Sequence, residues 1–498
     1  MLRVLSEFQS IIFLIDASKK IDAFKNKEDF PMKNIEFKVT SSSCCTPRVP
    51  SNTKETVKEE YASYNDNLPV AIIGAGPIGL AAAAHLAERG QNFILFEAGS
   101  SIGQNILQWG HVRLFSPWQY NIDKAAERLL RKQGWKPPVL TELPFGQEIV
   151  HQYLKPLAQL PELAPNIMLN SRVVSISKKN TDKMKSAHRE AAPFVLYVDT
   201  NNSTQRFEAR AVIDASGTWG HPNPLHADGI WTREERDLKD RIYYGIPDLS
   251  AEQRQKYAGK RVAVVGGGHS AINTLLDLAQ LKETDSNTEI IWVMRKKSVQ
   301  EAYGGEENDQ LEARGALGSR IHQLIDAGQI QVVTPLMIEG VSQQDGKIGI
   351  KGTANGEGKE IQGIDEVIVN TGSRPDFSFL SEIRLSMDPA TESVEALAPL
   401  IDPNVHSCGT VRPHGEKELR HLDKNFYLVG MKSYGRAPTF LMATGYEQVR
   451  SIAAYLDGDL EAALKVELEL PETGVCGISS APNANDCCLP ASSASGCK

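Results

Sequence analysis

The stretch that decides the fold runs from Pro69 to Gly90 and reads PVAIIGAGPIGLAAAAHLAERG. A short apolar strand leads into a glycine-rich turn, and a helical segment follows the turn. Gly74, Gly76 and Gly79 have the spacing G-x-G-x-x-G. The first glycine permits the tight turn, the second lets the backbone approach a pyrophosphate, and the third lets the helix pack closely on the strand. The pattern, in which Pro77 also lies, predicts a dinucleotide-binding loop.

The next strand, NFILFEAG, ends with an acidic residue in a position that suits this prediction. Glu97 lies 18 residues after Gly79, where a carboxylate can accept hydrogen bonds from the ribose hydroxyls of a dinucleotide. A glycine triplet alone is a weak motif. The ordered series of strand, loop, helix, strand and acid is much more specific.

A second copy of this pattern, RVAVVGGGHSAINTLLDLAQL, occupies Arg261–Leu281. Its loop has the form G-x-G-x-x-A, in which the final alanine still permits close packing of helix and strand. The histidine inside the loop is expected to lie near the phosphates and not to act as a catalytic base. The residues assigned to this second loop are Gly266, Gly268, His269, Ser270 and Ala271.

The strand after the second loop ends in cations instead of an acid. Its sequence, EIIWVMRKK, places Arg295 and Lys296 where the first unit has Glu97. A carboxylate there would repel a 2'-phosphate, whereas a guanidinium can bind it with two parallel hydrogen bonds. The second loop is therefore expected to bind NADPH in preference to NADH. The alternative is that these cations are a solvated strand end.

The bulk properties exclude several classes of protein. The 498 residues carry a formal net charge of -8, so the chain lacks the positive charge that non-specific binding of nucleic acid requires. No apolar run approaches the roughly 18 to 20 residues of a membrane-spanning helix, and the N-terminus has no clear secretion signal. We expect a cytoplasmic protein that acts on a small-molecule substrate.

Two glycine loops in tandem, with the second unit inserted in the first, resemble the flavoproteins that include the flavin-containing monooxygenases and the pyridine nucleotide-disulfide oxidoreductases. The resemblance covers about Leu68 to Leu456 and also rests on VIDASGTWGHPNP, GIPDLSAEQRQKYAGK and VIVNTGSRPD. It implies an α/β fold with two nested Rossmann-type domains, FAD on the first loop, NADPH on the second, and hydride transfer between them. Further FAD contacts implied by the resemblance are Val173, Ala215, Ser216, Gly217 and Gly430.

One departure from the family pattern concerns the end of the FAD domain. The family often has aspartate after the closing glycine, where it contacts the ribityl chain, but Gly430 is followed by Met431. The predicted domain limits are 1–66 for an N-terminal extension, 67–255 and 375–458 for the two parts of the FAD domain, 256–374 for the NADPH domain, and 459–498 for a flexible tail.

The seven cysteines leave the type of reaction open. None lies between Cys45 and Cys408, which disfavours both a disulfide framework and an internal disulfide reductase. A monooxygenase needs no such pair, and the loop with Trp109, Phe115, Trp118 and Tyr120 could enclose its reaction site or simply belong to the core.

The cysteine-rich tail supports a rival hypothesis, a flavin-dependent reductase of a thiol-bound metal or metalloid. The soft ligands that would hold arsenic or mercury there are Cys487, Cys488 and Cys497. A third hypothesis is a protein that senses cofactors or sequesters metal without catalysis. The sequence identifies no catalytic residue and no metal site in the body of the chain. It is compatible with a homodimer but does not fix the oligomeric state.

Overall fold

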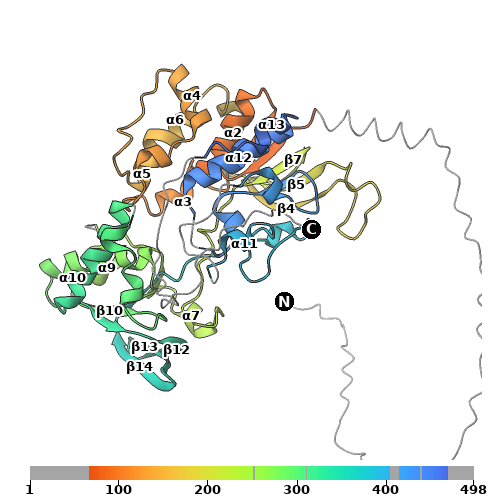
Figure 1. Ribbon diagram of the computed structural model, residues 1–498. Helices are drawn as coiled ribbons and strands as arrows, with labels where there is room; N and C mark the ends of the chain where they lie inside the picture. Colours follow the sequence, from red (N-terminus) through yellow and green to blue (C-terminus); the bar gives the residue numbers. More distant parts are fainter. Residues whose placement is uncertain (1–66, 251–252, 310, 404–413, 438–439, 469–498) are drawn as a thin grey trace, which may run out of the picture. The chain divides into compact units, whose positions relative to one another are not determined.

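A computed structural model describes residues 67–250, 253–309, 311–403, 414–437 and 440–468 (Figure 1). All seven cysteines lie outside these ranges, as does the predicted N-terminal extension, 1–66. The predicted roles of Cys487, Cys488 and Cys497 therefore fall outside the described residues.

The first unit is built on a five-stranded parallel sheet in the order β16-β7-β1-β2-β3. Every residue of β1 is buried, as expected for a parallel strand covered on both faces. Helices α2 (Pro77–Glu88) and α12 (Met442–Leu456) lie side by side in this unit (Figure 1). The strands are β1 (Val70–Ile73), β2 (Phe93–Phe96), β3 (Ile167–Met168), β7 (Ala211–Asp214) and β16 (Phe426–Leu428).

The second unit has the same architecture, a five-stranded parallel sheet in the order β11-β10-β9-β15-β8. Helices α9 (His269–Thr284) and α10 (Glu312–Asp326) pack against each other in this unit. The strands are β8 (Ile242–Tyr244), β9 (Arg261–Val265), β10 (Glu289–Val293), β11 (Gln331–Val333) and β15 (Glu366–Val369).

Two small antiparallel sheets accompany the parallel sheets. One has the order β4-β5-β6 and the other the order β12-β13-β14. Their strands are β4 (Arg172–Lys178), β5 (Phe194–Asp199), β6 (Thr204–Ala209), β12 (Met337–Gln344), β13 (Lys347–Ala354) and β14 (Glu357–Ile364).

The chain order shows that the second unit is nested in the first. Strand β16 pairs with β7 in the first sheet, although all strands of the second sheet lie between them in the sequence. The two connecting segments pair with each other through an antiparallel bridge between Pro222 and Ser373, and Asn223 N donates to Gly372 O at 2.9 Å. The predicted α/β fold with nested Rossmann-type domains is confirmed.

The second sheet begins earlier in the chain than the predicted boundary between residues 255 and 256. Strand β8 pairs with β15, with Ile242 opposite Val367. Because β8 has only three residues, it is too short to show a periodic pattern in the sequence.

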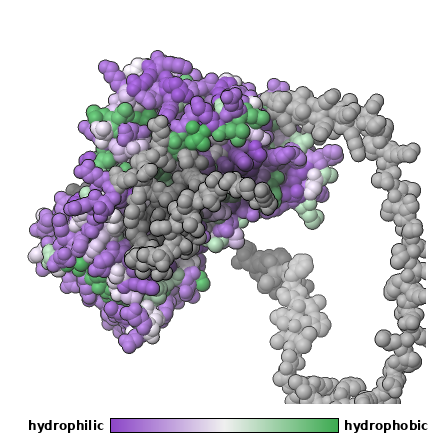
Figure 2. Space-filling view, viewed as in Figure 1, coloured by the Kyte–Doolittle hydropathy of each residue, from purple (hydrophilic) through white to green (hydrophobic). Residues whose placement is uncertain are grey.

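The structure also differs from the sequence prediction at residues 459–468, which were expected to begin the flexible tail. Asp459 is the N-cap of helix α13 (Leu460–Leu464), and its side chain accepts a hydrogen bond from Ala462 N at 3.1 Å. Ser451 Oγ of α12 donates to Ala463 O at 2.6 Å. An N-cap and a buried Ala463 thus hold these residues on α12. The surface near α13 shows hydrophobic residues in Figure 2, and Leu460 and Leu464 are exposed.

A buried ion pair fixes the amino end of β16. Arg189 donates through Nε and Nη2 to the two carboxylate oxygens of Asp423, at 2.8 and 2.6 Å, and both side chains are almost fully buried. Such a bidentate pair has a defined geometry. It joins the segment before β5 to the segment before β16.

The buried His421 side chain near this end of β16 predicts acid sensitivity. Burial lowers the pKa of His421 from 6.5 to about 4, so between these values the unfolded chain binds a proton that the folded chain does not. Stability should therefore fall as the pH drops from about 6.5 to 4, by up to about 3 kcal/mol. In His421→Gln, which can still accept the Ser386 N–H, the free energy of unfolding measured by urea denaturation should fall less over this range. An identical pH dependence in the variant and the wild type would contradict the assignment.

Candidate cofactor site

The first glycine loop lies at the carboxyl edge of the first sheet, between β1 and α2. Gly74 has a φ of +99°, and a Cβ there would lie 2.9 Å from Ala215 O. A Cβ on Gly79 would collide with the carbonyl oxygen of Gly74. These two glycines are therefore required by the fold itself, because strand β7 and helix α2 approach the loop closely.

Gly76 differs from its neighbours because open space faces it. It is the N-cap of α2, has ordinary extended backbone angles, and a Cβ on it would meet nothing within 4 Å. No side chain caps the helix there, and the first N–H groups of a helix have no partner inside it. This cradle fits a pyrophosphate, which binds to free N–H groups at a helix N-terminus.

Glu97 has a role that the sequence did not reveal. Its Oε2 accepts a hydrogen bond from Ala75 N, and its Oε1 accepts one from Gly99 N, both at 2.7 Å. The carboxylate therefore holds the glycine loop in place. A carboxylate has about four acceptor positions, so two remain for the hydroxyls of a ribose.

The remaining predicted FAD contacts lie around the same edge. Ala215, Ser216 and Gly217 form the turn that follows β7, and Gly217 has a φ of +72° with open space at its Cβ position. Gly430 begins the short helix η8 (Gly430–Tyr434) after β16, and a Cβ on it would lie 3.0 Å from Ile78 Cγ1 of α2. The structure thus brings the turn after β7, the start of η8 and the glycine loop together.

Val173, the remaining predicted FAD contact, does not belong to the first parallel sheet. It lies in β4 of a separate antiparallel sheet. Two residues before it, Ser171 N donates to Glu97 O at 2.8 Å, and Asn170 N donates to Gly99 O at 2.9 Å. The lead-in to β4 is therefore fixed to the end of the strand that carries Glu97. This places the backbone at Val173 close to that strand end, while its side chain is buried in the core.

In the second glycine loop, as in the first, one glycine is required by close backbone packing and another faces open space. Gly266 has a φ of +138°, and a Cβ on it would collide with Asn370 O at the end of β15. Gly268 is the N-cap of α9, and a Cβ there would meet nothing within 4 Å. Ala271 is fully buried and Ser270 is exposed. Gly268 and the amino end of α9 therefore face open space, as a phosphate site requires.

His269 is the first residue of α9, and its ring centroid lies 5.6 Å from that of Phe115. Burial lowers the pKa of His269, and the nearby Arg314 guanidinium lowers it further. The imidazole is therefore neutral at physiological pH. The ring joins the second loop to the aromatic segment of the first unit. Among the described residues, no acidic side chain forms a hydrogen bond with this imidazole.

The two cations predicted to bind the 2'-phosphate have different surroundings in the structure. Lys296 Nζ donates to Glu301 O, and its stem lies against Gly267. Arg295 is exposed just after β10, and among the described residues its side chain makes one long contact, of 3.4 Å from Nη1 to Ala227 O. With respect to the described part of the chain, the guanidinium of Arg295 is thus more available to a phosphate than the ammonium group of Lys296.

Aromatic side chains of the first unit contact the connecting segment and the second unit. Trp219, in the first connecting segment, donates from Nε1 to Gln108 Oε1 at 2.8 Å, and its ring lies 6.2 Å from that of Trp109. Phe115 contacts His269, as described above. Trp118 is buried in the first core. Trp109 thus contacts the connecting segment and Phe115 contacts the second unit. That this loop encloses a reaction site stays a prediction, and the prediction did not include Trp219.

The sequence reading also missed a buried ion pair at the carboxyl edge of the first sheet. Lys432 Nζ lies 2.7 Å from Asp214 Oδ2, and neither side chain has exposed surface. The prediction considered Met431 in place of the family's aspartate but not the residue that follows it. Hydropathy could not identify Lys432 because a lysine in a short segment is normally solvated.

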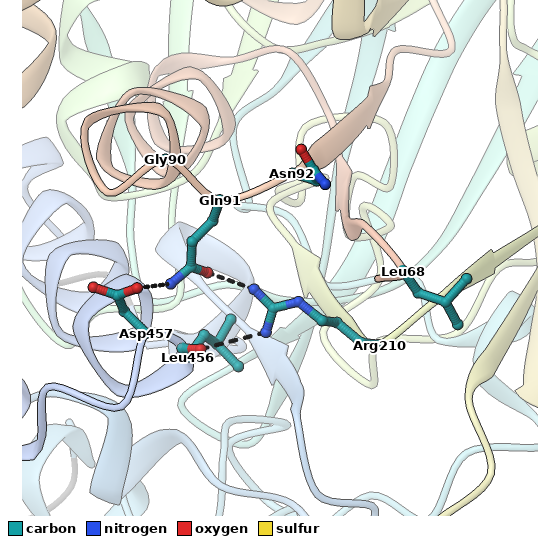
Figure 3. Close-up of a pocket in the computed structure, with 7 residues that line it drawn as sticks. All are labelled: Leu68, Gly90, Gln91, Asn92, Arg210, Leu456 and Asp457. Carbon is teal, nitrogen blue, oxygen red and sulfur yellow. Dashed lines mark hydrogen bonds between the residues drawn. The ribbon is translucent and has the colours of Figure 1, made fainter. Parts of the chain in front are cut away.

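Two other hollows lie outside this site. One, of about 270 Å³, is found beside the amino ends of β2 and β7, where Arg210 donates to Gln91 Oε1 and Gln91 donates to Asp457 Oδ1 (Figure 3). Ligands of parallel sheets bind at the carboxyl ends, so this hollow does not suit a cofactor. The other, of about 730 Å³, lies among α2, α12 and helix α4 (Lys124–Lys132) and is lined by paired charges such as Glu88 and Arg128.

Within the described ranges, no helix is long and apolar enough to cross a bilayer. The same residues contain no cluster of three or more histidine or acidic side chains that could hold a metal ion.

Comparisons with known proteins agree with this architecture. Ferredoxin--NADP reductase 1 of Shouchella clausii (strain KSM-K16) is 24% identical over 350 residues, which are 70% of this chain and 81% of the relative. Ferredoxin--NADP reductase 2 of Bacillus subtilis (strain 168) is 25% identical over 305 residues, or 61% and 72% of the two chains.

Solved structures give the same fold at low sequence identity. DfoA bound to FAD, a cadaverine monooxygenase from Erwinia amylovora, has a TM-score of 0.56 at 13% identity and covers 81% of this chain and 98% of its own. The bacillithiol disulfide reductase Bdr from Bacillus cereus has a TM-score of 0.55 at 18% identity and covers 78% and 99%. The family model described as pyridine nucleotide-disulphide oxidoreductase matches residues 71–408. The chain belongs to this family.

Proposed function

We propose that the chain is an FAD-dependent oxidoreductase that takes hydride from NADPH. FAD, when bound, accepts that hydride and passes the electrons to a further acceptor. Membership of the family supports the class of reaction. Two loops with open space at Gly76 and Gly268, each at the N-terminus of a long helix, support one dinucleotide on each.

Two residues support the placement of the two cofactors on different loops. Glu97 lies at the first loop and suits an unphosphorylated ribose, whereas the exposed Arg295 at the second suits a 2'-phosphate. FAD therefore belongs on the first loop and NADPH on the second. Trp109 contacts Trp219 of the connecting segment, and Phe115 contacts His269 of the second loop; these rings would help to exclude water where the two cofactors meet.

The final acceptor in this proposal is dioxygen, with one oxygen atom passed to a small nucleophilic substrate in a monooxygenase-like reaction. The observation that carries it is the absence of any cysteine between Cys45 and Cys408. The ring contacts of Trp109 with Trp219 and of Phe115 with His269 also support it. A flavin that reduces an internal disulfide needs a thiol pair beside it, whereas a reaction with dioxygen needs a site that excludes water.

Ferredoxin is a second candidate acceptor, because the curated relatives are ferredoxin--NADP reductases. The cysteine-tail hypothesis, with a thiol-bound metal or metalloid, concerns residues outside the described ranges and stays a prediction.

Oxygen and product measurements separate these acceptors. In a monooxygenase reaction, one substrate molecule, one NADPH, one proton and one dioxygen yield one oxygenated product, one NADP⁺ and one water. We expect purified holoprotein to consume dioxygen with NADPH and, with a panel of amines and thioethers under labelled dioxygen, to incorporate label into product. Ferredoxin-dependent reduction of cytochrome c without label incorporation would favour the second candidate. Turnover only with an arsenical or mercurial, lost on deletion of residues 469–498, would favour the third.

Arg295→Ala should reveal the preference for NADPH. The variant removes the guanidinium that is free to bind the 2'-phosphate, and charge-assisted hydrogen bonds contribute about 1.5 to 3 kcal/mol each. The KM for NADPH should rise by about 10- to 100-fold, while the KM for NADH stays nearly constant. The matched control is Arg233→Ala, which removes an arginine from the exposed helix α7 (Arg233–Asp237) and should change neither KM. Equal effects of Arg295→Ala on both nucleotides would contradict the phosphate assignment.

A further inference from the structure

The ion pair between Asp214 and Lys432 joins two neighbouring strands at the edge that faces the first glycine loop. Asp214 is the last residue of β7, and Lys432 lies in η8 just after β16. The distance from Nζ to Oδ2 is 2.7 Å, and both side chains are completely buried. The pair therefore fixes the end of β7 relative to the start of η8.

Ser216 is held by both members of the pair. Its backbone N and its Oγ donate to Asp214 Oδ1 at 3.0 and 2.6 Å. Lys432 Nζ in turn donates to Ser216 Oγ at 3.1 Å. The three side chains form a closed ring of hydrogen bonds, so the turn Ala215–Gly217 is tied to two strands at once.

Aromatic rings shield the ammonium group on another side. Lys432 Nζ lies 4.5 Å from the ring centroid of Phe379 and 5.6 Å from that of Phe377, distances at which a cation interacts favourably with a ring face. Both residues lie in the segment that returns the chain from the second unit to the first. The segment thus helps to keep water away from the pair.

A fully buried ion pair of this kind is poorly explained by stability alone. The cost of removing both charges from water commonly offsets their attraction, and apolar replacements of similar volume are often as stable. What the pair does achieve is a fixed position for the turn at Ser216. That turn is adjacent to the loop, because a Cβ on Gly74 would lie 2.9 Å from Ala215 O.

We propose that Lys432 and Asp214 are positioning residues for FAD, acting through Ser216 on the turn that borders the cofactor. This inference rests on the proposed function. Lys432 would thus hold the turn in place at the position where this chain has Met431 instead of the family's aspartate. The pair touches the turn and not the glycine loop itself, so its loss should weaken FAD binding without preventing it.

The test uses the full chain, stripped of FAD and titrated with FAD. The double variant Asp214→Asn/Lys432→Met leaves no unpaired buried charge and should keep its melting temperature within a few degrees of wild type. Its Kd for FAD should rise by about tenfold, and the visible circular dichroism of bound FAD should change. Ser216→Ala keeps the ion pair and removes only the hydroxyl link, and should raise the Kd several-fold.

The matched control is the buried pair at the other end of β16. Arg189→Met/Asp423→Asn should lower the melting temperature, because Arg189 also donates to the carbonyl oxygens of Thr181, Asp182 and Glu382. It should leave the FAD Kd and the visible circular dichroism unchanged. Wild-type affinity and spectra in the folded double variant at residues 214 and 432 would overturn the positioning role, as would an unchanged Kd in Ser216→Ala if that double variant does not fold. A wild-type chain that binds no FAD would overturn the proposed function as well.

Discussion

Gly76→Val should abolish tight binding of FAD while leaving the fold intact. The Cβ position at Gly76 meets no protein atom within 4 Å, and the backbone there has φ -85° and ψ -172°, which valine readily adopts. The added side chain would occupy the space assigned to the pyrophosphate and would block its hydrogen bonds to the helix N-terminus. Losing two such charge-assisted bonds corresponds to at least about 100-fold in Kd. Fluorescence titration of the apoprotein with FAD measures the effect.

A matched substitution separates this effect from a general cost of replacing glycine. Gly358, in the antiparallel hairpin strand β14, also has open space at its Cβ position and no positive φ. Gly358→Val should bind FAD like the wild type. Compared as apoproteins, so that stabilisation by bound FAD does not enter, both variants should melt at nearly the wild-type temperature. If Gly76→Val binds FAD normally, the first loop is not the pyrophosphate site.

Gly268→Val should produce the complementary defect. Gly268 is the N-cap of α9 and is exposed, with nothing within 4 Å of its Cβ position, so valine would fill the proposed phosphate site of NADPH. The variant should purify with FAD bound, but the rate at which NADPH reduces the flavin at subsaturating concentration should fall by at least about 100-fold. Anaerobic reduction monitored through the flavin absorbance measures this rate.

The two glycine variants act as controls for each other. Gly76→Val should lose FAD, whereas Gly268→Val should keep FAD with wild-type affinity and lose productive binding of NADPH. Reduction of the Gly268→Val flavin by NADPH at the wild-type rate would show that NADPH binds elsewhere. An exchange of the two phenotypes would mean that the cofactors are assigned to the wrong loops.

The features predicted well from the sequence are those with local and repeated patterns. Gly74 and Gly79 could be identified because each supports a close backbone approach that only glycine permits, and the structure shows those approaches at Ala215 and within the loop. The same glycine spacing in the second loop identified Gly266 and Gly268, and Gly268 is the N-cap of α9. Buried apolar strands next to such loops made the parallel sheets predictable as well.

The features that the sequence did not reveal depend on distant contacts. Asp214 and Lys432 are separated by 218 residues, and no local pattern relates them. The position of Trp219 depends on its hydrogen bond to Gln108 and on its ring contact with Trp109, both more than 100 residues earlier in the chain. Short elements were also missed, since β8 and α13 contain three and five residues and are stabilised by pairing or packing instead of by their own periodicity.

The most direct test of the central claim, that hydride passes from NADPH at the second loop to FAD at the first, is anaerobic mixing of the FAD-loaded protein with NADPH. We predict rapid loss of the absorbance of oxidised flavin, with a much higher rate at low concentrations of NADPH than of NADH. Flavin that stays oxidised in the presence of saturating NADPH would contradict the account.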